Sequence, residues 1–190
     1  MPPRFHLPQF PHAAKALSLG LTSLVPWIPA YVLFLDNVAS VKKVSGNSMS
    51  PAFCPNPTEH DWVLAKHWGA RENLERGQVV LYRSPVDPER EVIKRIVALE
   101  GDIVRTRLPY PTEFVKVPRG QAWMEGDEAF HSIDSNTYGA VPVALITSKI
   151  THILYPFSRA GKVAQDERLS RPGVLYRRAA PKERIAVFGL

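Results

Sequence analysis

The sequence has a single cysteine, Cys54, among its 190 residues. One cysteine cannot form an internal disulfide or a cysteine-based zinc cluster. The histidines include no i, i+4 pair and no His-Glu-x-x-His motif, so we expect no catalytic metal and no cofactor. No motif frames Cys54 between Phe53 and Pro55, which favours a packed thiol over a nucleophile.

Acidic residues are absent from residues 1–35, which carry Arg4 and Lys15 and contribute to a net charge of +6. The positive excess over the rest of the chain is spread out and forms no basic stripe interleaved with aromatic residues. We interpret the pair Arg177-Arg178 as part of a solvated tail. Nucleic acid is therefore not expected as a partner.

Glycine is less frequent than proline, with 11 residues against 18, which disfavours a helical bundle and favours short strands joined by rigid turns. Between two of the expected strands, Glu100-Gly101-Asp102 is typical of a β-hairpin. The sequence predicts a mainly β fold, an antiparallel sheet with a barrel-like or sandwich-like shape. The expected strands are 61–66, 77–82, 91–99, 103–107, 114–117, 121–124 and 150–155.

Charge is also absent from residues 16–35, between Lys15 and Asp36. A helix of this length measures about 30 Å, the thickness of the hydrocarbon core of a bilayer. Pro26 and Pro29 would kink such a helix, and a cleaved secretory signal or a buried core helix are the alternatives. We expect a retained transmembrane helix at 16–35, preceded by a separate N-terminal segment at 1–15.

The chain after Phe157 is rich in basic residues and contains proline, with little periodicity. This composition predicts an irregular or partly mobile C-terminal tail at 157–190. The segment 36–156 is then the folded domain.

The stretch Ser45-Gly46-Asn47-Ser48-Met49-Ser50-Pro51 is typical of a loop that holds a hydroxyl out from a scaffold. Taken alone, such a stretch favours a solvated connector.

A lysine in a predicted strand gives the serine loop a possible partner. Alternation in the strand at 91–99 places Lys94 on one face with Val92 and Ile96, and turns Arg95 the other way, toward the surface. Desolvation among apolar neighbours lowers the pKa of a lysine, which suits it as a general base for a serine hydroxyl. The alternative is a lysine that extends its amine to the strand edge.

Three short motifs follow one another along the chain. They are Gly46-x-Ser48-Met49-x-Pro51, then Ile93-Lys94-Arg95-Ile96-Val97-Ala98-Leu99-x-Gly101-Asp102, then Gly126-Asp127 followed by Ser132-Ile133-Asp134-Ser135. Together, and in this order, they resemble the type I signal peptidase family over residues 30–156. Further segments resemble the subunit 2 branch of the mitochondrial inner membrane proteases, in which Asn136 replaces the arginine usual in bacterial relatives and in subunit 1. These segments are 98–106, 115–120, 131–139 and 151–154.

This resemblance implies a Ser/Lys dyad. Ser48 would be the nucleophile that forms an acyl-enzyme, and Lys94 the general base that takes its proton and later activates the water. Ser132 matches the hydroxyl that orients the lysine, and Asp134 matches a structural carboxylate. Met49 matches a position that packs beside the nucleophile.

The chain departs from the family pattern at two positions beside the nucleophile. Gly46 stands where some bacterial members have a serine that supports the oxyanion. Stabilisation of the oxyanion would then depend on backbone donors such as the Ser48 amide, or on Ser45. Residue 52 is alanine where threonine or serine is usual.

The resemblance also implies a cellular setting. It places an all-β catalytic domain on the intermembrane-space side of the mitochondrial inner membrane, tethered to membrane lipid by a single N-terminal helix. The substrates would be precursor proteins with hydrophobic sorting signals, cut after a small residue. The companion subunit 1 of the inner membrane protease complex would be a partner in a heterodimer.

Three alternatives remain open. A Ser-His-Asp hydrolase could draw on Asp61 and one of four histidines, but no Gly-x-Ser-x-Gly motif is present. A self-cleaving repressor with the same dyad would need a DNA-binding module, which the sequence does not indicate. A non-catalytic, membrane-anchored partner subunit would not need both Ser48 and Lys94.

Overall fold

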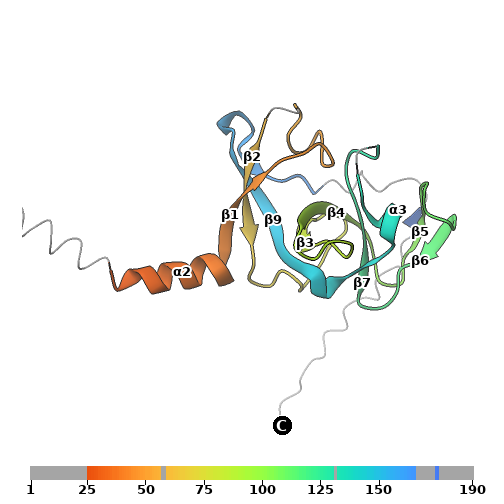
Figure 1. Ribbon diagram of the computed structural model, residues 1–190, viewed down its shortest axis with the longest axis horizontal. Helices are drawn as coiled ribbons and strands as arrows, with labels where there is room; N and C mark the ends of the chain where they lie inside the picture. Colours follow the sequence, from red (N-terminus) through yellow and green to blue (C-terminus); the bar gives the residue numbers. More distant parts are fainter. Residues whose placement is uncertain (1–24, 57–58, 131, 166–173, 176–190) are drawn as a thin grey trace, which may run out of the picture.

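The computed structural model describes residues 25–56, 59–130, 132–165 and 174–175. A helix, α2 (Trp27–Asn37), leads directly into the first strand of a large antiparallel sheet (Figure 1). The sheet has the order β1-β2-β9-β3-β4-β7-β8, with β10 added beside β9. Its strands are β1 (Ala39–Val44), β2 (Asp61–Lys66), β3 (Val79–Arg83), β4 (Glu91–Leu99), β7 (Gln121–Glu125), β8 (Val141–Pro142), β9 (Ile146–Tyr155) and β10 (Gly161–Lys162).

This large sheet is curled. An ion pair of 3.2 Å joins Lys42 on β1 to Glu91 on β4, although three strands lie between β1 and β4 in the sheet order. The prediction of a mainly β, antiparallel fold is confirmed. Short 3₁₀ turns at Val143–Leu145 and Phe157–Arg159 flank β9 on either side.

A small second sheet has the order β11-β5-β6, built from β5 (Ile103–Arg105), β6 (Phe114–Lys116) and β11 (Val174–Leu175). The expected hairpin at residues 100–102 is therefore wrong, because β5 pairs with β6 and β11 and not with β4. The Asp102 carboxylate accepts hydrogen bonds from the Leu99 amide at 2.9 Å and from Arg76 at 2.8 Å. These bonds fix a turn that leads the chain out of the large sheet into the small one.

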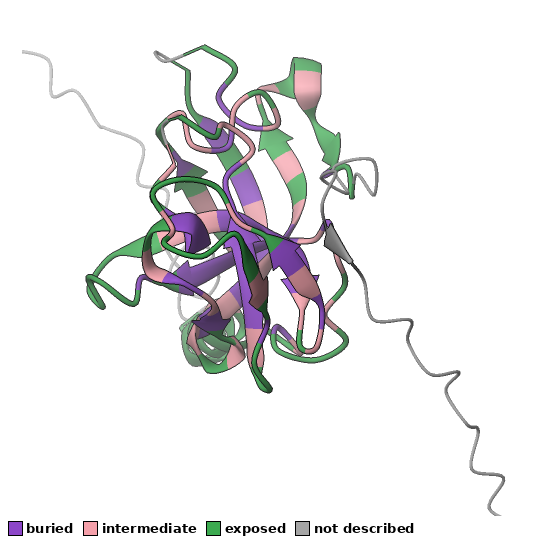
Figure 2. Cartoon of the chain, turned by 90° about the vertical axis from the view of Figure 1, so that its right-hand side faces the viewer, coloured by how far each residue is buried: buried purple, intermediate pink, exposed green. Residues whose placement is uncertain are grey.

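The strands bury side chains in three apolar clusters, and Figure 2 shows that the buried residues concentrate in the strands of the domain. Along β2, buried and more exposed residues alternate, as expected for a sheet with one covered face. By contrast β4 is buried at five successive residues, 94–98, because both of its faces are covered. The centre of β4 is thus removed from water on both sides.

Arg95, expected at the surface, is only 4% exposed. Its guanidinium donates to both carboxylate oxygens of Asp127, at 2.8 and 2.7 Å, and to the carbonyls of Gly77 and Ala164. The expectation failed because residues 163–165 and the loop after β7 cover this face of β4, and neither lies near Arg95 in the sequence.

The predicted transmembrane segment falls partly outside the described residues, which begin at residue 25. Among the residues described, no helix has both the length and the apolar character needed to cross a membrane. The helix α2 has 11 residues and buries none of them. Its apolar side chains, including Trp27 at 70% and Leu33 at 63%, are exposed.

Two pieces of the predicted C-terminal tail belong to the sheets. β10 pairs with β9 through Gly161 and Lys162, and β11 pairs with β5. The rest of that tail, residues 166–173 and 176–190, lies outside the described part of the chain.

The buried Arg95–Asp127 pair makes a testable contribution to stability. Asp127→Ala leaves a buried, uncompensated guanidinium, so we expect a loss of about 3–5 kcal/mol in the free energy of unfolding. Glu113→Ala breaks an ion pair whose partners are 60% and 62% exposed, and it should cost less than about 1 kcal/mol. Urea unfolding followed by tryptophan fluorescence, with the full chain in mild detergent, measures both. Equal losses of unfolding free energy in the two variants would contradict the assignment of Arg95–Asp127 as a buried, stabilising pair.

Candidate active site

The serine loop is anchored by the residues that follow Ser48. Met49 and Phe53 are 2% and 0% exposed and pack in an apolar cluster with Val79, and the Phe53 amide donates to the Met49 carbonyl at 2.9 Å. Ser48 itself is half-buried. Burial of Met49 thus fixes the backbone on one side of Ser48 and leaves the serine at the edge of the core.

Lys94 lies in the centre of β4 with its side chain only 3% exposed, so it does not extend to the strand edge. Burial lowers its pKa to about 8, and the positive charge of Arg90 acts in the same direction. The negative charges of Asp134 and Asp127 oppose this effect. Within the described residues, no hydrogen bond or ion pair holds the Lys94 amine. The lysine can therefore be neutral at mildly basic pH.

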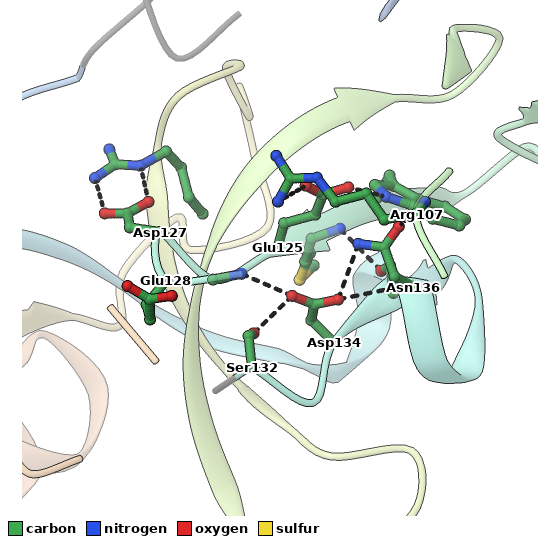
Figure 3. Close-up of polar contacts among 12 residues, drawn as sticks. Arg107, Glu125, Asp127, Glu128, Ser132, Asp134 and Asn136 are labelled. Atoms are coloured by element: carbon green, nitrogen blue, oxygen red, sulfur yellow. Dashed lines mark hydrogen bonds and ion pairs between the residues drawn. The ribbon is translucent and has the colours of Figure 1, made fainter. Parts of the chain in front are cut away.

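The third motif wraps around the carboxylate of Asp134 (Figure 3). Asp134 caps the short helix α3 (Ser135–Tyr138) by accepting from the Asn136 amide at 3.0 Å, and the Asn136 side chain donates to the same oxygen at 3.1 Å. Its other oxygen accepts from the Ser132 hydroxyl at 2.6 Å and from the Gly126 amide at 3.0 Å. The carboxylate thus holds Ser132 in place next to the end of β7.

Gly126 is the point at which the three motifs meet. A Cβ on Gly126 would lie 2.8 Å from the Ser132 Cβ and closer still to the Ser132 hydroxyl and the Ser48 carbonyl oxygen. The β4–β7 pairing ends with Arg95 opposite Glu125, and Lys94 and Gly126 are the next residue of each segment beyond that pair. The Ser48 backbone and the Ser132 side chain thus meet at a residue without a side chain, which follows directly on the β4–β7 pairing beside Lys94.

Sequence reasoning used Gly126 only as part of a motif and did not identify its role. The signal was present as a glycine two residues after the end of a predicted strand, where close approach of another backbone is one of the usual reasons for a glycine. The Ser48 carbonyl also accepts from the Glu128 amide at 3.2 Å. The serine loop is thus held against the segment that follows β7.

A buried polar network behind Asp134 was also missed. The Asn136 side-chain oxygen accepts from the Arg107 amide at 2.7 Å, and the Arg107 guanidinium lies 3.8 Å from Glu125. Glu125 in turn accepts from the Trp123 indole at 2.8 Å. This network fixes the orientation of the Asn136 amide, because its oxygen is already used and its nitrogen must face Asp134.

Gly46 has a φ of +100°, a backbone conformation that suits glycine and strains a side-chain-bearing residue. A Cβ at this position would meet nothing within 4 Å. A side chain at position 46 would therefore be disfavoured by the backbone conformation and not by lack of space.

The other candidate nucleophiles, Cys54 and Ser40, lie in surroundings that favour nucleophilic attack less. Burial raises the pKa of the Cys54 thiol, which contacts the Val44 carbonyl at 3.5 Å. Ser40 and His67 form a hydrogen bond of 2.8 Å, but the second ring nitrogen of His67 faces the Thr147 carbonyl and not a carboxylate. The described residues contain no group of three His, Cys, Asp or Glu side chains able to hold a metal.

Comparison with known proteins agrees with this arrangement of motifs. Residues 18–108 match the family described as "Signal peptidase, peptidase S26". A mitochondrial inner membrane protease subunit 2 from Schizosaccharomyces pombe is 45% identical over 146 residues, covering 76% of this chain and 80% of that protein. The subunit 2 protein of Mus musculus is 47% identical over 134 residues, or 70% of this chain and 76% of that one.

Subunit 1 of the human mitochondrial inner membrane protease is less similar, with 35% identity over 130 residues, covering 66% of this chain and 75% of that protein. A solved signal peptidase I from Enterococcus faecalis is 19% identical and covers 42% of this chain and 98% of that one at a TM-score of 0.37, too limited a likeness to argue from. On the identity and coverage of the subunit 2 relatives, the chain belongs to the signal peptidase family, peptidase S26, and within it resembles the mitochondrial inner membrane protease subunit 2 proteins.

Proposed function

We propose that this peptidase is a serine endopeptidase that uses Ser48 as nucleophile and Lys94 as general base. The observation that carries the proposal is the meeting of the Ser48 backbone and the Ser132 hydroxyl at Gly126, next to the β4–β7 pairing where Lys94 is buried with its pKa lowered to about 8. A buried lysine that can lose its proton near neutral pH suits a general base for a hydroxyl, and costs stability if it serves no purpose.

The proposed reaction proceeds in two halves. In the first, neutral Lys94 takes the proton of the Ser48 hydroxyl while Oγ attacks the scissile carbonyl carbon. The resulting tetrahedral intermediate collapses as Lys94 returns the proton to the leaving amine, which gives an acyl-enzyme. In the second half Lys94 takes a proton from water, which attacks the ester carbonyl, and the Ser48 hydroxyl is regenerated.

Ser132 is the proposed residue that orients the lysine. Its hydroxyl proton is donated to Asp134 at 2.6 Å, so the Ser132 oxygen has only lone pairs left to offer. This oxygen would accept a hydrogen bond from an N–H of Lys94. The lone pair of neutral Lys94 would then be directed toward Ser48.

Stabilisation of the oxyanion would rely on backbone donors. The Ser48 amide is the family donor, and Gly46 supplies no hydroxyl. Ser45 is exposed in the same loop and is the remaining side-chain candidate. Preorganised backbone amides are effective in this role because they do not have to reorient during the reaction.

The proposed substrates are mitochondrial intermembrane-space precursors, from which hydrophobic sorting signals are removed. The chain would be anchored once in the inner membrane, with its catalytic domain facing the intermembrane space, and would pair with subunit 1. Two observations support this setting: the names of the subunit 2 relatives, and α2, whose apolar side chains no part of the described chain buries. The competing interpretation is a non-catalytic partner subunit anchored in the same membrane.

The dyad is tested by substitution in the detergent-solubilised full chain, assayed with its companion subunit on an intermembrane-space precursor. Ser48→Ala and Lys94→Ala should each lower kcat by about 10³-fold or more, because each removes a group that acts as part of a unit. Ser40→Ala and His67→Ala are the controls and should retain activity. Loss of activity only in these controls would favour a serine–histidine hydrolase, and activity in all four variants would favour the non-catalytic partner.

The pH dependence follows from the lowered pKa of Lys94. The base must be neutral to accept a proton, so kcat/KM should be low at pH 6, rise through a midpoint near pH 8, and level off above it. Initial rates of peptide cleavage between pH 6 and pH 10 measure this profile. A kcat/KM that falls over the same range would contradict a lysine base.

Gly126→Ala tests the convergence point. The added methyl group would overlap the Ser48 carbonyl and the Ser132 hydroxyl, so the serine loop or the end of β7 must shift. A displacement of about 1 Å at a reacting group can lower kcat by about 10²-fold. Gly120→Ala is the control: its φ of +71° makes the substitution costly to stability, but the added carbon would meet nothing within 4 Å, so kcat of the folded protein should change little. Equal activity of the two variants would contradict the placement of the site.

A further inference from the structure

Asp134 differs from the other buried carboxylates of the described chain. Its side chain accepts four hydrogen bonds, and every donor is neutral: a hydroxyl, two backbone amides and a side-chain amide. In the described residues no arginine, lysine or histidine lies within ion-pair distance of it. Each other buried carboxylate has an arginine partner; these pairs are Asp61–Arg159, Asp102–Arg76, Glu125–Arg107 and Asp127–Arg95.

An uncompensated carboxylate that is 4% exposed projects its full field into its surroundings. Four neutral donors stabilise the ionised form without cancelling its charge. In a desolvated site the field of such a charge is screened far less than at the surface. This field stabilises any nearby group that gains a positive charge.

Lys94 is that group. The same Asp134 oxygen that accepts from the Gly126 amide also accepts from the Ser132 hydroxyl. Gly126 follows Glu125, which pairs with the residue next to Lys94 in β4, and the negative charge of Asp134 acts on Lys94. Ser132 can then accept from Lys94 while it donates to Asp134. Such a bond would link the amine to the carboxylate through one hydroxyl.

We propose that Asp134 is the counter-ion of Lys94 and acts through Ser132 as a positioning residue that stabilises the ammonium formed when Ser48 is deprotonated. The inference deepens the proposed function and rests on it. A carboxylate with only a structural role would be served equally well by an arginine partner, as the other four are. Because no arginine of the described chain pairs with Asp134, its negative charge can act on Lys94.

The remaining groups around Lys94 do not take over this role. Asp127 is neutralised by Arg95 at 2.7 Å, and Arg90 is itself positive. Tyr82 and Tyr138 share a hydrogen bond of 2.5 Å, and burial raises the pKa of both hydroxyls, so both stay neutral. Asp134 is thus the one unpaired charge of opposite sign among the described groups that act on Lys94.

Asn136 keeps Asp134 unpaired. Its side chain occupies the second carboxylate oxygen as a neutral donor, and the Arg107 amide fixes its orientation. A cationic side chain at position 136 would neutralise Asp134 while leaving its bonds to Ser132 and Gly126 in place. Asn136→Arg is therefore a second way to test the charge, independent of Asp134 itself.

The test is the pH profile of kcat/KM for the full chain with its companion subunit. Asp134→Asn removes the charge and keeps the shape, so the midpoint of the rise should move about one pH unit lower, and kcat on the plateau should fall. Asn136→Arg should move the midpoint in the same direction. Glu91→Gln removes a half-exposed carboxylate from the strand of Lys94, already paired with Lys42, and should leave the midpoint in place.

A second measurement does not need cleavage. In the Ser48→Ala background, the pH dependence of the ¹³Cε chemical shift of Lys94 reports its pKa directly, and the same two substitutions should lower it. Midpoints and lysine pKa values that stay unchanged in both Asp134→Asn and Asn136→Arg would overturn the counter-ion, even if cleavage remains dependent on Ser48. Cleavage that survives Ser48→Ala would overturn the proposed function and this inference with it.

Discussion

The burial of Lys94 is the constraint on which the rest of the site depends. An ammonium in the centre of β4 would lose its hydration, and no ion pair in the described chain offsets that loss. The protein meets this cost by letting the amine be neutral at mildly basic pH. Its neighbour Arg95 cannot lose its proton, so it takes the opposite solution and is fully paired with Asp127. Two adjacent basic residues on one strand thus have different surroundings: Arg95 is held in a structural ion pair, and Lys94 is the proposed proton acceptor.

Close approach at Gly126 is the second constraint, and it follows from the first. A buried amine can act only on groups that reach into the same desolvated space. The end of β7 leaves that space open because position 126 lacks a side chain, and the Ser48 backbone and the Ser132 hydroxyl occupy it. The Arg95–Asp127 pair fixes β4 against the loop after β7. The structural pair on one face of β4 therefore maintains the geometry on the other face.

The bounds of β4 match the predicted residues 91–99, because alternation and β-branched residues are local properties. Features that depend on distant segments were not predictable. The turn at Gly101 has the same local composition whether the next strand joins the same sheet or another one, so the hairpin was predicted wrongly. The burial of Arg95 depends on Asp127, 32 residues away. The candidate site residues came from matched motifs, and only the structure brings those motifs to one glycine.

In the described domain, the buried carboxylates with a structural role differ from Asp134, the one with a proposed functional role, in whether an arginine is paired with them. Where a carboxylate only holds the fold together, an arginine neutralises it, as at Asp61 and Asp102. Such pairs produce little net electric field, so proton transfer nearby changes their energy little. Asp134 is held equally firmly, but by neutral donors. The electrostatic interaction energy between Asp134 and Lys94 therefore changes whenever Lys94 gains or loses a proton. Firm placement together with an unbalanced charge is what a proton-transfer site requires, because stabilisation of a transient ammonium needs a fixed field that is already present before the proton moves.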